Sequence, residues 1–154
     1  MTDYRVIIAG SRSLNDYALL REHCLSILQE KMKAHRVIIV SGHARGADSF
    51  GERFAKEFSL PFELHPAKWR LLGKAAGMVR NAEMSKCSDE LIAFWDGESR
   101  GTRYMINFAR KRGLEVSVIN TTLKNRIDNN SQKTERNTIV APDEEKMAIK
   151  CCHR

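Results

Sequence analysis

Three apolar runs in this chain each end in a glycine-containing loop, and each loop is followed by a helical pattern. The runs are residues 5–9, 36–40 and 90–95, and their loops begin at Gly10-Ser11-Arg12, Ser41-Gly42 and Asp96-Gly97. Short runs rich in valine and isoleucine, without polar alternation, are typical of strands buried on both faces. Parallel strands need a long crossover between them, usually a helix. The chain is therefore predicted to be an α/β protein whose glycine loops lie at the carboxyl ends of its strands.

Two further strand-like runs, residues 62–65 and 115–120, complete the pattern. Apolar residues at helical spacing follow the capping candidates Asn15-Asp16, and again follow Asp48 and Gly101. This alternation predicts a doubly wound parallel sheet of about five strands with helices on both faces.

The pattern of strands and helices stops near residue 120. A chain of 154 residues is close to the usual size of one domain, so residues 1–120 are expected to form a single domain. Residues 121–154 are dominated by Asn, Gln, Lys and Ser and show no sustained apolar periodicity. We predict that this polar C-terminal appendage is partly disordered or packed weakly on the domain.

The chain has a formal net charge of +7, but the basic residues do not form one block. Several arginines instead lie in or beside the glycine-containing segments: Arg12, Arg45, Arg80, Arg100 and Arg103. That placement favours a small polyanionic ligand at least as much as a nucleic-acid duplex.

The cysteines, Cys24, Cys87, Cys151 and Cys152, lack the paired spacing of metal ligands. We therefore expect no metal site and a reducing, cytoplasmic location. No apolar run approaches the roughly 20 residues that a membrane-spanning helix needs. Neither a secretory leader nor a membrane partner is expected.

The candidate ligand site lies where the glycine loops meet. In an open parallel sheet, ligands bind beyond the carboxyl ends of the strands, at the point where the strand order reverses. The free N–H groups of the helix expected after Gly101 would face an anion there. The candidates for ligand and phosphate binding are Gly10, Ser11, Arg12, Gly42, Arg45, Gly46, Asp48, Arg80, Asn81, Asp96, Gly97, Ser99, Gly101 and Thr102. Neither the full G-x-G-x-x-G pattern nor a P-loop occurs, which argues against a standard hydride-transfer site or a P-loop NTPase.

Some of these residues have purely structural alternatives. Gly101 could simply help to cap a helix, and Asp48 could cap its helix or accept a ribose hydroxyl. Arg45 and Arg80 could form structural ion pairs. Trp69 lies in an irregular segment and is the candidate for stacking on a base.

Four motifs occur in a fixed order along the chain. They are Gly10-Ser11-Arg12, Ser41-Gly42-x-Ala44-Arg45-Gly46-Ala47-Asp48, Gly77-x-x-Arg80-Asn81-x-x-Met84 and Phe94-Trp95-Asp96-Gly97-x-Ser99-x-Gly101-Thr102. In combination, over about residues 4–120, they resemble the YspA/YpsA-related branch of the SLOG superfamily, which includes the LOG phosphoribohydrolases and the DNA-processing protein DprA. The resemblance implies a Rossmann-like domain that binds nucleotides or NAD- and ADP-ribose-derived ligands. It also implies a homo-oligomer, a dimer in related domains, and a role as a ligand sensor in signalling, phage conflict or defence.

The chain departs from the LOG enzymes at the position that matters for their chemistry. Their last motif ends in a glutamate that serves in cleaving the base from a nucleotide, and here Met105 holds that position. A methionine can neither transfer a proton nor stabilise a cationic sugar. We therefore predict that the chain binds or senses a phosphorylated nucleotide or an NAD/ADP-ribose-derived ligand through its glycine loops, with no certain cofactor beyond that ligand.

Two alternatives stay open. A nucleotide N-glycosidic hydrolase would need a displaced carboxylate, for which Asp96 and Asp48 are the candidates. A DprA-like single-strand nucleic-acid binder would use the positive charge, but the sequence lacks an obvious stripe of lysine and aromatic residues.

Overall fold

The computed structural model describes residues 1–122, and most of the predicted appendage, residues 123–154, lies outside the described residues. The strands are β1 (Asp3–Gly10), β2 (Arg36–Ser41), β3 (Phe62–Leu64), β4 (Glu90–Trp95) and β5 (Glu115–Asn120). The helices are α1 (Tyr17–Ala34), α2 (Ala47–Glu57), α3 (Trp69–Leu72), the short 3-10 helix η1 (Gly73–Ala75), α4 (Ala76–Cys87) and α5 (Arg100–Lys111). All five predicted strands are present, although β1 and β2 are longer than predicted and β3 ends one residue earlier.

The strands form one parallel sheet in the order β3-β2-β1-β4-β5. The chain passes from β1 to β2 and β3 on one side, and then returns to place β4 and β5 on the other. The strand order therefore reverses between β1 and β4, where Gly10 is paired with Phe94. This confirms the predicted fold class and places the loops after β1, β2 and β4 at one edge of the sheet.

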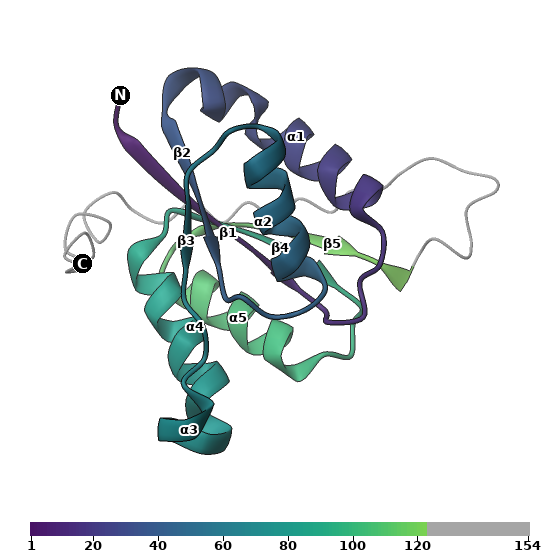
Figure 1. Ribbon diagram of the computed structural model, residues 1–154, viewed down its shortest axis with the longest axis vertical. Coiled ribbons are helices and arrows are strands. Elements are labelled where there is room, and N and C mark those ends of the chain that lie inside the picture. Colours follow the sequence, from purple (N-terminus) through teal and green to yellow (C-terminus); the bar gives the residue numbers. More distant parts are fainter. Residues whose placement is uncertain (123–154) are drawn as a thin grey trace.

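Helices cover both faces of the sheet, with α1 and α2 on one face and α4 and α5 on the other (Figure 1). Successive residues of β1 point to opposite faces: Val6 and Ile8 pack in the cluster under α1 and α2, and Ile7 and Ala9 pack in the cluster against α4 and α5. Residues 6–9 of β1 are buried on both faces, which explains why this part of the strand is apolar without interruption.

The N-caps of α1 and α5 test the predicted helix starts. Asp16 caps α1 as predicted, because its side chain accepts a hydrogen bond from the Leu19 N–H at 3.0 Å. The prediction for the last helix is wrong by a few residues. Ser99 is its N-cap, and α5 begins at Arg100, before Gly101. The Ser99 hydroxyl accepts from the Thr102 N–H at 3.4 Å, and this side-chain bond determines where the helix begins.

The segment after Pro66 is more ordered than its sequence suggests. It forms α3, η1 and the start of α4, which together extend below the body of the domain in Figure 1. Several apolar side chains here are exposed, including Trp69, Leu71, Leu72, Met78 and Val79. This protruding segment begins just beyond the carboxyl edge of the sheet, beside the predicted ligand site.

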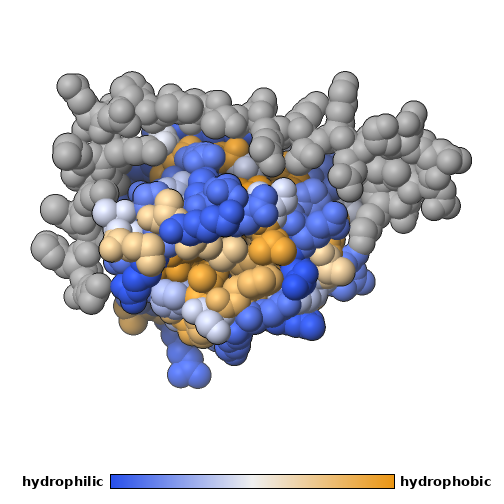
Figure 2. All heavy atoms as spheres, turned by 90° about the horizontal axis from the view of Figure 1, so that it is seen from above, coloured by the Kyte–Doolittle hydropathy of each residue, from blue (hydrophilic) through white to orange (hydrophobic). Residues whose placement is uncertain are grey.

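The surface at the opposite end mixes hydrophobic and hydrophilic side chains. Seen from above the view of Figure 1, hydrophobic side chains gather near the middle of this face and hydrophilic ones surround them (Figure 2). Scattered apolar exposure is ordinary on folded proteins. Among residues 1–122, each helix is too short or too polar to cross a membrane.

A buried ion pair holds the amino-terminal edge of the sheet. Glu90, at the start of β4, is fully buried, and its Oε2 lies 2.5 Å from Lys31 Nζ of α1. The same Nζ lies 2.9 Å from Glu115 Oε2 of β5. Burial raises the pKa of Glu90, and within the described part of the chain its Oε1 has no hydrogen-bond partner. Lys31 is therefore the group that makes a charged Glu90 tolerable inside the fold.

Replacing Lys31 should destabilise the domain strongly. Lys31→Met leaves the Glu90 carboxylate unpaired, and we expect a loss of about 3–5 kcal/mol in the free energy of unfolding near neutral pH. Urea denaturation measures this loss. Lys33→Met, on the same helix, removes only an exposed pair with Glu30 and should cost less than about 1 kcal/mol. Equal losses for the two variants would contradict a structural role of the buried pair.

Candidate functional site

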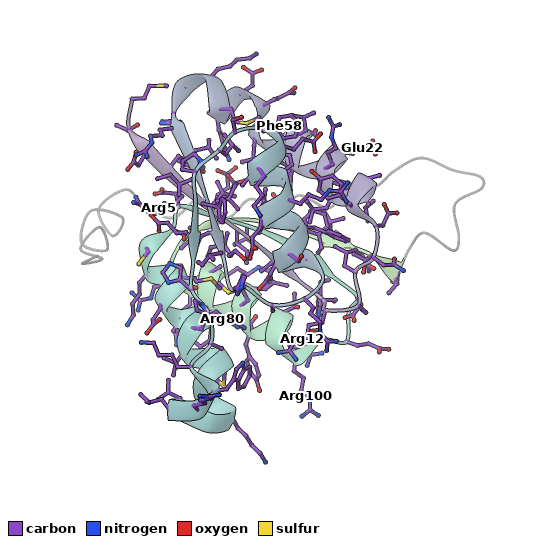
Figure 3. All side chains as sticks on the ribbon, viewed as in Figure 1. Arg5, Arg12, Glu22, Phe58, Arg80 and Arg100 are labelled. Atoms are coloured by element: carbon purple, nitrogen blue, oxygen red, sulfur yellow. The ribbon has the colours of Figure 1, made fainter. Side chains whose placement is uncertain are left out.

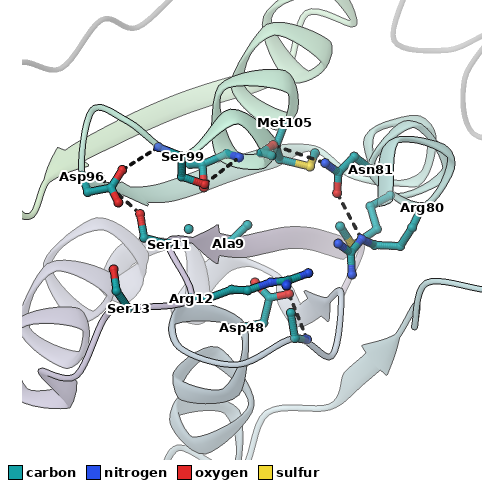
Figure 4. A pocket seen from close by; sticks show the side chains of 15 residues that line it. Ala9, Ser11, Arg12, Ser13, Asp48, Arg80, Asn81, Asp96, Ser99 and Met105 are labelled. Atoms are coloured by element: carbon teal, nitrogen blue, oxygen red, sulfur yellow. Dashed lines mark hydrogen bonds between the residues drawn. The ribbon is translucent and has the colours of Figure 1, made fainter. Parts of the chain in front are cut away.

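A cavity of about 450 Å³ opens at the carboxyl edge of the sheet, between the loops that follow β1 and β4 (Figure 4). It will be called the first cavity. The predicted site residues that line it are Gly10, Ser11, Arg12, Asp48, Arg80, Asn81, Asp96, Ser99, Gly101 and Thr102. The structure thus brings together most of the residues that were singled out from four separate motifs.

A second cavity, of about 310 Å³, adjoins the first and shares Arg12, Ala44 and Arg80 with it. Its remaining lining residues are Gly42, His43, Arg45, Pro66, Ala67 and Trp69. Gly42, Arg45 and Trp69 therefore lie in a neighbouring space and do not line the first cavity. Gly46 and Gly97 line neither cavity.

Sequence reasoning missed several lining residues. The first cavity also includes Ala9, Ser13, Ala44, Met84 and Met105, none of which was proposed to contact the ligand. Ser13 has a detectable signal, since it follows the predicted loop residues directly. Met84 and Met105 also have a signal, since Met84 belongs to one of the four motifs and Met105 holds the position of the LOG glutamate, but a methionine at such a position is equally suited to the core.

Two glycines permit the close approach of the loops. A side chain on Gly10 would place its Cβ 2.1 Å from the carbonyl oxygen of Phe94 on the paired strand. Gly46 has a φ of 75°, and a Cβ there would lie 2.4 Å from the carbonyl oxygen of Ser11. Both positions therefore need glycine to pack the first and second loops against their neighbours. Ligand contact by Gly46 stays a prediction.

Asp96 organises the loop that leads into α5. Its Oδ1 accepts hydrogen bonds from the N–H groups of Glu98 and Ser99, at 2.9 and 2.8 Å. These bonds lower the pKa of Asp96. Its own N–H donates to Ser11 Oγ at 3.2 Å, which ties the first loop to the last. Asp96 is thus held as a carboxylate and is poorly suited to accept a proton in a reaction.

The pKa of Asp48 is shifted in the opposite direction from that of Asp96. It is buried, and its Oδ2 accepts from the Ala44 N–H at 3.2 Å. Gly46 is the N-cap of α2, so the alternative that Asp48 caps this helix is not observed. Burial raises the pKa of Asp48 to about 6, although the nearby charges of Arg80 and Arg12 oppose the shift. Asp48 therefore changes its charge close to physiological pH.

Arg80 links three parts of the site. Its Nη1 donates to the Gly42 carbonyl at 2.6 Å, and its Nε donates to Asn81 Oδ1 at 3.1 Å. Asn81 Nδ2 in turn donates to the Gly101 carbonyl at 3.4 Å. The ion pairs found among residues 1–122 include neither Arg45 nor Arg80, so the structural pairs considered for them are not observed there. Burial lowers the pKa of Arg80.

The arrangement suits an anion that carries hydroxyl groups. The guanidinium groups of Arg12 and Arg80 and the first turn of α5 supply donors, and Asp48 supplies an acceptor. Met84 and Met105 give the cavity an apolar wall. Within the described range, no group of three or more His, Cys, Asp or Glu side chains is placed to hold a metal ion.

Comparison with known proteins identifies the family. The model of the YspA, cpYpsA-related SLOG family matches residues 4–71. The "Gene 61 protein" of Mycobacterium phage D29 is 36% identical over 118 residues, which cover 73% of this chain and 93% of that protein. The chain belongs to the YspA, cpYpsA-related SLOG family.

Two solved structures share the fold. One is TM1055, a structural genomics target, with a TM-score of 0.53 and 16% identity over 75% of this chain and 72% of that chain. The other is DNA processing protein A from Helicobacter pylori, whose structure was described for its single-stranded DNA binding mode. It has a TM-score of 0.53 and 20% identity, over 80% of this chain and 68% of that chain.

The raised pKa predicts that Asp48→Asn stabilises the free protein above pH 6. The folded chain binds the Asp48 proton more tightly than the unfolded chain does, so stability falls as the pH rises from about 4 to about 6. Asparagine keeps an acceptor for the Ala44 N–H without the charge. We expect a gain of about 1–3 kcal/mol at about pH 8 and none at about pH 4, measured by urea unfolding.

Asp96→Asn is a control for which the expected change in stability has the opposite sign. The pKa of Asp96 is lowered in the folded chain, so its charge is stabilising and its removal should cost stability at neutral pH. If Asp48→Asn lost more stability at about pH 8 than at about pH 4, the charge of Asp48 would be stabilising in the fold, which would contradict this prediction.

Proposed function

We propose that this chain is a binding or sensing module for a phosphorylated nucleotide or an NAD/ADP-ribose-derived ligand, held in the first cavity. The observation that carries the proposal is the convergence of Arg12, Arg80 and the first turn of α5 on one cavity at the reversal of the strand order. Arg12, Arg80 and Arg100 lie in the same lower part of the molecule (Figure 3). Family membership supports a nucleotide-related ligand.

The proposed position of the phosphate is the first turn of α5. The positive end of the helix dipole favours an anion there. The Thr102 N–H donates to Ser99 Oγ and the Arg103 N–H donates to the Ser99 carbonyl, so the proposed donors to the phosphate are the N–H groups of Arg100 and Gly101. Gly101 lines the first cavity, and a Cβ built on it would have no atom within 4 Å. The backbone is therefore open to a ligand at this point. A ribose hydroxyl would then donate to Asp48.

Gly101→Asp should abolish binding without harming the fold. The added carboxylate meets open space and favours the first turn of a helix, but it repels a phosphate. With ADP-ribose, NAD or AMP at about 100 times its Kd, the wild type should gain about 2.7 kcal/mol of stability by mass action. We expect this gain, measured as a rise in Tm, to be lost in the variant.

Gly101→Ala is the matched control for this experiment. It adds a methyl group at the same point without charge, so it should keep a substantial part of the ligand-induced shift. If Gly101→Asp responds to ligand as the wild type does, the phosphate does not lie at α5.

The site favours binding over hydrolysis. Met105 is buried in the wall of the first cavity, and the carboxylate of Asp96 is engaged by loop N–H groups. General acid–base catalysis is typically worth about 10² to 10⁴ in rate. We therefore expect the wild type to release free base from AMP at a rate close to background, as measured by chromatography of the products. Rapid release that Asp48→Asn abolishes would instead establish the hydrolase alternative, with Asp48 as the displaced carboxylate.

A single-stranded nucleic acid is the second candidate ligand. The net charge of +7 and the exposed indole of Trp69 beside the arginines favour it, as does the fold shared with DNA processing protein A. Such binding would weaken steeply with salt, because each neutralised phosphate releases counterions. The oligomeric state, which we expect to be a dimer, can be measured in the same samples by sedimentation.

A further inference from the structure

The second cavity differs from the first in its chemistry. Among residues 1–122, three arginines line it, Arg12, Arg45 and Arg80, and no carboxylate does. Within the same part of the chain, its aromatic rings are the indole of Trp69 and the imidazole of His43. The described lining of the first cavity, in contrast, contains Asp48 and Asp96 and no aromatic residue. One space is thus suited to a sugar phosphate, and the other is suited to a flat π-system close to negative charge.

The two cavities adjoin at the shared arginines. Arg12 and Arg80 line both spaces, so a group bound between their guanidinium groups can extend in either direction. Arg80 is fixed in this position by its 2.6 Å hydrogen bond to the Gly42 carbonyl. Phosphates are the groups that such guanidinium pairs recognise best. A ligand with phosphate in its middle would therefore reach into both cavities.

Trp69 is placed to stack on what enters the second cavity. It begins α3, lines the second cavity and is 51% exposed, so its ring is accessible to a ligand. A Cβ on Gly77 would lie 3.6 Å from Trp69 Cη2 and 3.9 Å from Arg80 Nη2. The ends of the Trp69 and Arg80 side chains thus lie close together beside Gly77, and both side chains line the second cavity. Aromatic rings and arginine side chains are the usual stacking partners of nucleic-acid bases.

We propose that the second cavity is a base subsite, in which Trp69 stacks on an aromatic base of the ligand held in the first cavity. The inference rests on the proposed function and narrows it. The ligand would place a ribose in the first cavity, a diphosphate between the first turn of α5 and the guanidinium groups of Arg12 and Arg80, and a base at the other end, against Trp69. A nucleoside joined through a diphosphate to a second ribose has this form, and ribose 5-phosphate represents its first half alone.

The test compares ADP-ribose with ribose 5-phosphate on Trp69→Ala, by calorimetry or by competition. Trp69→Ala should weaken the binding of ADP-ribose roughly 10- to 100-fold, because the stacking of the base on the indole is lost. The affinity for ribose 5-phosphate should stay unchanged. Trp69→Phe keeps a ring and should restore most of the ADP-ribose affinity. Leu71→Ala is the matched control, since Leu71 lies on the same helix, is 81% exposed and lines neither cavity.

The outcomes separate this inference from the proposed function. If the wild type binds both probes and Trp69→Ala changes neither affinity, the base subsite is overturned while ligand binding in the first cavity stands. If the wild type binds neither probe, the proposed function itself fails. Trp69→Ala could also weaken the binding of both probes equally and change the sedimentation of the protein. Trp69 would then belong to an interface between copies of the chain, and the base subsite would again be overturned.

Discussion

The parallel pairing of β1 with β4 determines where every other part of the site can form. At Gly10 and Phe94 the two strands approach so closely that a Cβ on Gly10 would lie 2.1 Å from the Phe94 carbonyl oxygen. Just beyond this point the Ser11 N–H donates to that same oxygen at 3.0 Å. The first loop is thereby attached to β4 before it turns toward α1. The loop after β4 is attached in return, through the bond from the Asp96 N–H to Ser11 Oγ.

A buried carboxyl group lies at each end of the sheet, and the two groups have different partners. Glu90, at the amino edge, is paired with Lys31 at 2.5 Å, and this ion pair opposes the rise in the pKa of Glu90 that burial causes. Asp48, at the carboxyl edge, accepts a bond from the Ala44 N–H, and no ion pair found among residues 1–122 includes it. The charge of Asp48 therefore lowers the free energy of unfolding, and a neutral side chain at this position would not lower it. A buried carboxyl group whose pKa is raised in this way is typical of functional sites, where stability is reduced in favour of binding.

The sequence allowed the sheet to be predicted because its strands are short apolar runs without competing signals, as in residues 90–95. It did not allow the start of α5 to be predicted, because Ser99, Gly101 and Thr102 are all acceptable near a helix start. The choice of Ser99 depends on its hydroxyl reaching the Thr102 N–H, which is a matter of three-dimensional geometry. The role of Asp48 was ambiguous for the same reason, since a position after a loop glycine suits both a cap and a loop anchor.

The second cavity was beyond sequence reasoning for a different reason. It combines Arg12, Arg45, Trp69 and Arg80, which come from four separate segments. Trp69 was noticed as a stacking candidate, but only the path of the chain through α3 places it beside the arginines of the other loops. Local patterns predict elements and their ends, whereas a space between elements depends on how those elements pack.

The same packing connects ligand charge to proton binding. Asp48 changes its charge at a pH of about 6, and Arg12 and Arg80 now act to keep it ionised. A phosphate bound between these arginines would neutralise part of their charge and add negative charge beside Asp48. Both effects raise the pKa of a carboxyl group. Ligand binding near neutral pH would therefore be accompanied by proton uptake at Asp48, and by linkage the affinity would increase as the pH falls toward 6. A protonated Asp48 can donate to a ribose or phosphate oxygen as well as accept, so the site remains complementary to its ligand in both charge states.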